Sequence, residues 1–173
     1  MDLAQLKVIS KPNTWFTLAT TAIKMPAKKD LFMAISLQCG MFKDGATATP
    51  VDDSNTKVRV LVDGVEAHSG HVIFCRKTQS LAPFPGLQAC TGTSGVRFFD
   101  GCAMGTSERA SVLRSLLGNT FQYVLLNVGV GIHTIKVQAL MDSGTGADGS
   151  PIRAVIGHGP ATVEDVRLIN SQQ

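Results

Sequence analysis

Histidine has the side chain best suited to acid–base chemistry near neutral pH. One of the four histidines, His133, stands in a glycine-flanked stretch, GVGIHTIKVQ. An imidazole there could act as a general base or a metal ligand, because its ordinary pKa lies near neutrality. Either role needs a second group, and no acid–base partner stands at a motif spacing from His133. We therefore interpret His133 as the residue where a turn becomes a strand, with a ring that packs or hydrogen-bonds locally.

Two further sets of side chains could bind a metal. His68 and His71 flank a Ser-Gly turn, where two imidazoles could hold an ion weakly, although exposed hairpin residues are the commoner interpretation. Oxygen ligands of the kind that calcium prefers lie near loop or strand ends: Asp44, Asp52, Asp53, Asp63 and Asn55. Since the ligand order of an EF-hand is missing, we expect neither a metal nor a cofactor, and calcium is the lesser alternative.

The four cysteines are Cys39, Cys75, Cys90 and Cys102, and none stands in C-x-x-C spacing. An even number in a loop-rich chain allows two disulfides in three connectivities. We favour Cys39–Cys75, whose residues end two predicted strands, and Cys90–Cys102, which would close a glycine-rich loop. In a reducing compartment all four would instead be small buried hydrophobic residues.

Catalytic motifs are missing from the sequence. It contains no nucleophile elbow, P-loop, zincin spacing or dinucleotide fingerprint. Ser107 suits a helix N-cap better than a nucleophile. Glu164 and Asp165 are adjacent on a predicted strand and point to opposite faces unless a bulge realigns them. We therefore expect no enzyme, and an active site assembled from distant loops is the third-ranked alternative.

A carbohydrate-binding β-sandwich usually exposes several aromatic rings, but this chain has one tryptophan and one tyrosine. Trp15 lies near the start of an early strand and is the candidate ligand platform. Burial of Trp15 is the simpler interpretation, because one ring makes a small platform.

The composition indicates a surface with few charges. Charged residues make up 17% of the 173 residues, against about 25% in typical domains, and hydrophobic residues make up 44%. The net charge of +3 is spread over scattered residues, which argues against nucleic-acid binding. No stretch has the apolar length of a membrane span, and the first ten residues do not resemble a signal peptide, so the chain is either intracellular or a processed form. Low charge suits a surface that meets other copies of itself, and it is equally compatible with a secreted β-protein that has a polar, neutral surface.

Short alternating runs separated by turn residues predict one all-β domain over residues 1–173. About eight or nine strands with uneven connections favour a jelly-roll-like β-sandwich. Asp63-Gly64 predicts a tight hairpin, and one short helix is expected over residues 107–117. Alternation assigns these residues to the core: Leu31, Met33, Ile35, Leu37, Cys39, Val58, Val60, Val62, Ile135, Val137, Ala139 and Met141.

The closing segments GVGIHTIKVQA and GPATVEDVRLI resemble the final strands of uncharacterised prokaryotic β-sandwich proteins. KMPAKKDLFMAISLQCG, VRVLVDG and VIFCRK are similar to the same group, so the resemblance covers most of the chain. It implies a jelly-roll-like sandwich and no catalytic residue, since no activity is established for the group. In architecture alone the chain is similar to trimeric jelly-roll heads of the tumour-necrosis-factor and C1q type, whose motifs it lacks.

We expect a non-enzymatic structural or interaction module that self-assembles through its sheet edges and low-charge surface. Its partners would be other copies of the chain, in a homo-oligomer or an extracellular or cell-surface filament. Residues 1–12 are a candidate arm, in which Leu3, Leu6, Val8 and Ile9 would pair with a neighbouring subunit. An ordinary first strand is the equal alternative for this segment. The second function is a carbohydrate- or ligand-binding module that uses Trp15 or the loop of residues 78–105.

Overall fold

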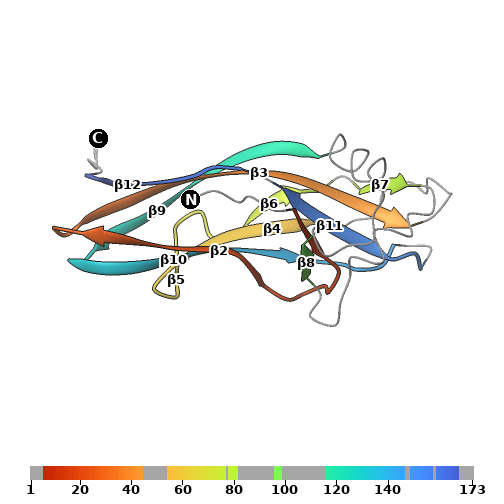
Figure 1. Cartoon of the computed structure of the whole chain (residues 1–173), viewed down its shortest axis with the longest axis horizontal. Helices are drawn as coiled ribbons and strands as arrows, with labels where there is room; N and C mark the ends of the chain where they lie inside the picture. The colour runs from red at the N-terminus through yellow and green to blue at the C-terminus, as the bar shows by residue number, and fades with distance from the viewer. Residues whose placement is uncertain are drawn as a thin grey trace, which may run out of the picture.

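The computed structural model describes residues 6–44, 54–76, 78–81, 96–98, 116–146, 149–157 and 159–167. These residues form twelve strands in two sheets that pack face to face, and the described part contains no helix (Figure 1). The predicted all-β sandwich is confirmed. The strands outnumber the expected eight or nine, and some are only a few residues long, such as β7 (Thr78–Leu81). β1 (Lys7–Ile9) pairs within the chain's own sheet, as the alternative of an ordinary first strand predicts for residues 1–12.

The larger, seven-stranded sheet is built around one long strand, β3 (Lys29–Asp44). β12 and then β11 run antiparallel along one edge of β3. β9 runs antiparallel along the other edge, followed by a short parallel pairing with β7. β1 and β8 extend the sheet beyond β11. The bounds of these partners are β8 (Val96–Phe98), β9 (Leu117–Val128), β11 (Ile152–Gly157) and β12 (Ala161–Val166).

The smaller, five-stranded sheet has the order β2-β10-β4-β5, and β6 also pairs with β4. The tight hairpin predicted at Asp63-Gly64 joins β4 to β5, and both turn residues have positive φ. β2 lies at the edge of this sheet, and β10 is its one partner strand in the described part of the chain. The bounds are β2 (Phe16–Met25), β4 (Thr56–Val62), β5 (Val65–Glu66), β6 (Val72–Cys75) and β10 (Gly131–Met141).

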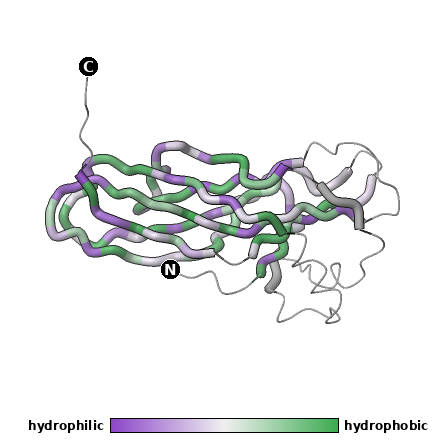
Figure 2. Tube along the Cα trace, turned by 90° about the horizontal axis from the view of Figure 1, so that it is seen from above, coloured by the Kyte–Doolittle hydropathy of each residue, from purple (hydrophilic) through white to green (hydrophobic). Residues whose placement is uncertain are grey.

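The core lies between the two sheets, where the alternating residues predicted from the sequence are buried. Hydropathy alternates along the strands in Figure 2, as a strand with one buried face requires. β11 departs from this pattern, because all six of its residues are buried. Val155 and its register partner Val8 lie on the face away from the main core, together with the buried ring of Phe42. The larger sheet is therefore covered on both faces at this point.

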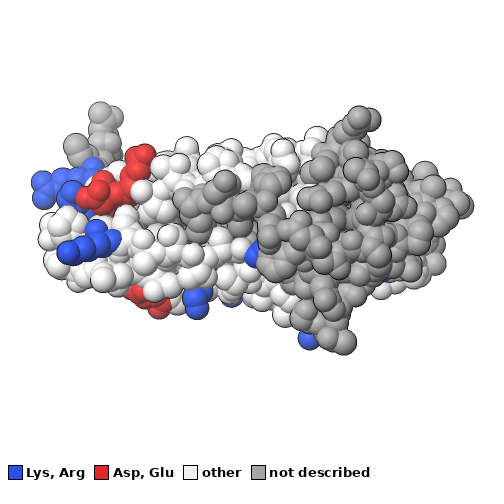
Figure 3. Space-filling model, viewed as in Figure 1, with Lys and Arg blue, Asp and Glu red and all other residues white. Residues whose placement is uncertain are grey.

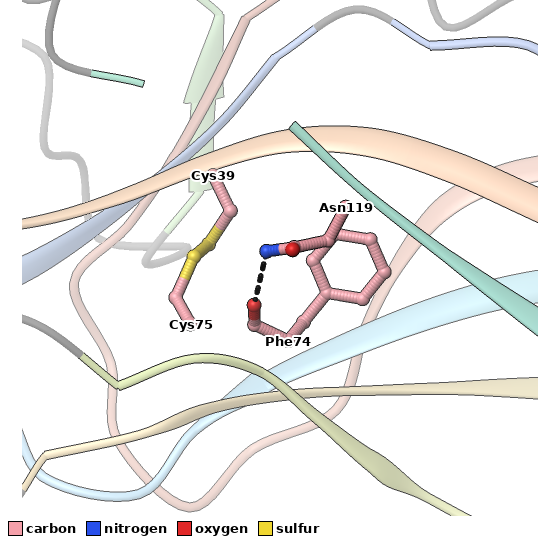
Figure 4. Close-up of a disulfide and its surroundings, with 4 residues drawn as sticks. All are labelled: Cys39, Phe74, Cys75 and Asn119. Atoms are coloured by element: carbon pink, nitrogen blue, oxygen red, sulfur yellow. Dashed lines mark hydrogen bonds between the residues drawn. A yellow bond between two sulfur atoms is a disulfide. The ribbon is translucent and has the colours of Figure 1, made fainter. Parts of the chain in front are cut away.

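Among the contacts that tie the two sheets together in the described residues are a disulfide and two hydrogen bonds. The Cys39–Cys75 disulfide joins β3 to β6, which confirms the favoured pairing (Figure 4). In the same view, the Asn119 side-chain amide of β9 donates a hydrogen bond to the Phe74 carbonyl at 2.9 Å. The buried Tyr123 hydroxyl of β9 donates to the Val58 carbonyl of β4 at 3.0 Å, and burial raises the pKa of this phenol. Cys90–Cys102 lies outside the described residues.

Two sequence expectations need correction at strand boundaries. Most of the expected helix, residues 107–115, lies outside the described residues, but Leu117 is the first residue of β9. The bulge considered at Glu164-Asp165 is wrong, because β12 pairs with β3 in one uninterrupted register. Both carboxylates are exposed, and Asp165 forms an ion pair with Lys29, which lowers the pKa of the Asp165 carboxyl. No helix able to cross a lipid bilayer occurs among the residues described.

Candidate functional site

Polar and aromatic side chains gather on the outer face of the smaller sheet. Gln138 of β10 lies opposite Arg59 of β4 on one side and opposite Thr17 of β2 on the other, so the three side chains form a row across neighbouring strands. Trp15 directly precedes β2, two residues before Thr17, at the end of the row that β2 contributes. We name the group the Trp15 cluster; its members are Trp15, Thr17, Arg59, Glu66, His71 and Gln138.

Arg59 is the centre of the cluster. Its Nε and Nη2 donate to Gln138 Oε1 at 3.0 and 2.9 Å, and its Nη1 donates to Glu66 Oε2 at 3.3 Å. The guanidinium carbon lies 4.1 Å from the centroid of the Trp15 ring, within the range of a cation–π interaction. These contacts fix a long, flexible side chain in one position against the sheet.

The rim of the cluster is more open to solvent. Gln138 Nε2 donates to the Thr17 hydroxyl at 3.1 Å. The His71 ring centroid lies 6.3 Å from that of Trp15, and His71 Nδ1 is 3.8 Å from Glu66 Oε1. The His71 side chain is 55% exposed. The cluster therefore combines a fixed centre with hydrogen-bonding groups that face water.

A second arrangement joins two turns at the other end of the smaller sheet. His133 Nδ1 lies 2.7 Å from Asp63 Oδ2, and His133 Nε2 lies 3.0 Å from the Gly129 carbonyl oxygen. Asp63 Oδ1 also accepts a hydrogen bond from the Thr134 backbone N–H at 2.7 Å. Both partners of the imidazole are acceptors, so only the protonated ring, which carries two N–H groups, satisfies both contacts.

These contacts shift the pKa values of both partners. The hydrogen bond to Asp63, followed by that to the Gly129 carbonyl, raises the pKa of His133 above its ordinary value of 6.5. The Thr134 N–H and then His133 lower the pKa of Asp63 below 3.8. The imidazole contribution to stability is complete below pH 6.5 and is lost as the pH rises through the raised value. The contribution of the Asp63 carboxylate to stability is lost as the pH falls through the lowered pKa of Asp63. The pair therefore stabilises the fold most between the lowered pKa of Asp63 and the raised pKa of His133.

We predict that Asp63→Asn lowers the pKa of His133, because the amide removes the negative charge and the carboxylate acceptor. Asparagine tolerates the positive φ of 49° at this position, so the hairpin should be retained. An NMR pH titration of the His133 ring resonances measures the effect. Equal His133 pKa values in the two proteins would show that the Asp63 contact does not form in solution.

The third feature of functional interest is the open edge of β2, the edge with which no strand of the described residues pairs. Lys7 Nζ donates to the backbone carbonyls of Thr17 and Leu18, beside the register shift where β2 passes Gln138. Beyond this point Lys24 carries the one charged side chain of the segment 18–25. Figure 3 shows several charged side chains together at one end of the visible face and further ones along its lower edge.

The structure places the other predicted residues as follows. Trp15 is neither fully buried nor fully exposed. Leu6, Val8 and Ile9 are buried within the chain, where β1 pairs with β11 and β8, and Leu3 lies outside the described residues. His68 pairs through its backbone with Val124.

The predicted oxygen ligands do not come together in the described part of the chain. Asp63 is bound to His133, and Asn55 Nδ2 lies 3.5 Å from Asp142 Oδ2. Asp52 and Asp53 lie outside the described residues, as does the side chain of Asp44. No group of three or more histidine, cysteine or acidic side chains suited to a metal is found in the segments described.

Sequence reasoning identified Trp15 but missed Arg59, Glu66 and Gln138 as its neighbours. Alternation predicts that Arg59 and Gln138 point outward. It does not reveal which residue of a neighbouring strand lies opposite each of them, and that depends on register.

The sequence matches no protein-family model and no curated protein. Solved structures of similar shape include the C-terminal domain of EclA, a sugar-binding protein, at 7% identity and a TM-score of 0.41, covering 93% of this chain and 78% of that one. A structure of infectious bursal disease virus, Gt strain, matches at 11% identity and a TM-score of 0.43 over 93% of this chain and 33% of that one. An insecticidal delta-endotoxin from Bacillus thuringiensis matches at 12% identity and a TM-score of 0.39, covering 90% of this chain and 19% of that one. At these scores the comparisons assign neither a family nor a function, and the resemblance to prokaryotic sandwich proteins stays a prediction.

Proposed function

We propose that this chain is a non-catalytic interaction module that binds other copies of itself through the open edge of β2. The observation that carries the proposal is a strand edge with almost no charge. Natural proteins usually protect such edges with charged side chains, proline or bulges, because unpaired backbone groups recruit further strands. Lys7 of β1 and the register shift protect the beginning of β2, and Lys24 is the one charged side chain in the rest of the strand.

The direction of the free backbone groups follows from the hydrogen bonds of β10. The Thr134 carbonyl accepts from the Asp63 N–H, and the Thr134 N–H donates to Asp63, so both groups point away from β2. Backbone groups of successive residues alternate in direction, and Ile135 therefore faces its partner Thr21 in β2. It follows that the backbone N–H and C=O groups of Thr20, Ala22 and Lys24 point outward from the sheet edge.

An antiparallel pairing of two β2 strands centred on Ala22 would use all of these groups. It would place Thr20 of each copy opposite Lys24 of the other, which keeps the two lysines apart. The pairing is symmetric, as in most homodimers, and joins two five-stranded sheets into one. Exchange of residues 1–12 between copies is the alternative route to assembly.

An extracellular or cell-surface location forms part of this proposal. The Cys39–Cys75 disulfide supports it, because structural disulfides persist mainly in oxidising compartments.

We predict that Ala22→Pro abolishes the assembly. Proline removes the outward N–H and adds a ring at the edge, and it spares the β2–β10 ladder because this N–H points away from β10. Light scattering at high micromolar concentration should show a multimer for the wild type and a monomer for the variant. Circular dichroism confirms that the variant is folded, and Ala22→Ser, which keeps the N–H, is the matched control.

A charge pair at Thr20 gives a second, milder test. Thr20→Lys would place like charges directly opposite each other and should weaken association about tenfold, whereas Thr20→Glu should preserve it. A wild type that stays monomeric would overturn the proposal. So would a multimer that persists unchanged in both Ala22→Pro and Thr20→Lys.

A further inference from the structure

We infer that the Trp15 cluster is a binding surface for a neutral oligosaccharide. The inference does not rest on self-association, since the cluster lies on the outer face of the sheet and the free backbone groups of β2 lie at its edge. Three properties of the cluster carry it: a fixed aromatic ring, polar groups with spare hydrogen-bonding capacity, and balanced charge.

The aromatic ring is the first property. Trp15 is partly exposed and is held against the sheet by the guanidinium of Arg59, 4.1 Å from its centroid. A sugar ring presents C–H bonds on one face and hydroxyls at its rim. An indole ring is an amphipathic surface of large area and low conformational freedom, and it packs well against such a face. Because Trp15 is already fixed, little ordering of this side chain opposes binding.

Spare hydrogen-bonding capacity is the second property. The Thr17 hydroxyl accepts from Gln138 Nε2, which leaves the hydroxyl proton free to be donated and leaves Gln138 with a second amide proton. Glu66 presents carboxylate oxygens to the same surface, with more acceptor sites than its contact to Arg59 fills. Donors and acceptors thus stand side by side, as sugar hydroxyls, which both donate and accept, require.

The third property is charge. The positive charge of Arg59 is matched by Glu66 at 3.3 Å, so the centre of the cluster favours neither an acidic nor a basic ligand. The row from Thr17 through Gln138 to Arg59 crosses two inter-strand spacings, about 10 Å, which suits a short oligosaccharide better than a small ion. Together these properties favour a neutral, hydroxyl-rich ligand.

The test uses the fluorescence of Trp15, the one tryptophan of the chain, which reports on this surface alone. The probes are neutral oligosaccharides (cellobiose, maltose, xylobiose, lactose and chitobiose), with galacturonic acid and glucosamine as charged comparisons. We expect a saturable change in emission with at least one neutral probe and a weaker response to the charged ones. No saturable response to any neutral probe at millimolar concentration would overturn the inference, as would tighter binding of a charged probe.

Variants identify the surface with a method that does not depend on tryptophan. In calorimetric titrations with the best probe, Trp15→Ala and Gln138→Ala should each weaken binding about tenfold or more. Trp15→Phe, which keeps an aromatic ring, should weaken it less. Lys136→Ala is the matched control, because Lys136 is exposed on the same strand outside the cluster. Equal oligosaccharide binding by Trp15→Ala and the wild type would overturn the inference. Oligosaccharide binding that survives in the monomeric Ala22→Pro variant would show that the binding surface does not depend on self-association.

Discussion

Removing the inter-sheet disulfide with Cys39→Ala/Cys75→Ala is expected to lower the free energy of unfolding by about 4 kcal/mol. The bridge joins residues separated by 36 positions and connects the two sheets, so its loss frees a long loop in the unfolded chain. Alanine keeps the buried positions apolar and adds no unpaired polar group. Urea denaturation at 25 °C measures the change, with circular dichroism as the probe.

Peptide mapping under non-reducing conditions shows whether the two cysteines are linked in the protein used. The comparison is meaningful for a preparation in which Cys39 and Cys75 are found in one linked peptide. If the double variant then unfolds at the same urea concentration as the oxidised wild type, the stabilisation expected from loop closure is wrong for this chain.

Replacing Gly159 by alanine is expected to cost about 3 kcal/mol of stability, because this glycine lies against the backbone of β3. A Cβ atom there would fall 1.7 Å from the Ser36 carbonyl oxygen and 2.9 Å from the Leu37 Cα. Backbone atoms cannot rotate away as a side chain can, so the strands must separate. The adjacent hydrogen bond from the Ser36 N–H to the Pro160 carbonyl, 3.0 Å long, would be disturbed.

Gly118 is the matched control for this substitution. It lies in β9 on the other edge of β3, and a Cβ atom there meets no heavy atom within 4 Å. We expect Gly118→Ala to change the free energy of unfolding by less than about 0.5 kcal/mol in the same urea titration. Similar losses at the two positions would show that close approach to β3 is not the reason Gly159 is needed.

The sequence predicts the core of this fold well, because burial between two sheets imposes a period of two along each strand. Ile135, Val137, Ala139 and Met141 are buried as that period requires. The Cys39–Cys75 disulfide was also favoured from the sequence, because each cysteine ends a predicted strand. The strand Val65–Glu66 follows the turn predicted at Asp63-Gly64, and the strand Val72–Cys75 follows the Ser-Gly turn between His68 and His71.

The contacts of the candidate sites could not be predicted in the same way. His133 bonds locally to the Gly129 carbonyl, as expected, but its other partner, Asp63, is 70 residues away in the β4–β5 turn. Which turns meet depends on the order of strands in the sheet, and alternation carries no information on that order. Arg59 and Gln138 become neighbours for the same reason.

The position of β3 between two sets of partners has a consequence for folding. Ile35 is paired on one side with Phe121 and on the other with Ala161, so the longest strand of the sheet is synthesised early and its partners arrive late. Contacts of such high contact order form slowly, because a long loop must close before they stabilise the chain. A nascent chain would therefore expose β3 without these partners until β9 and β12 have left the ribosome. An apolar strand that waits unpaired is exposed to intermolecular pairing, so aggregation during folding is the risk that this topology carries.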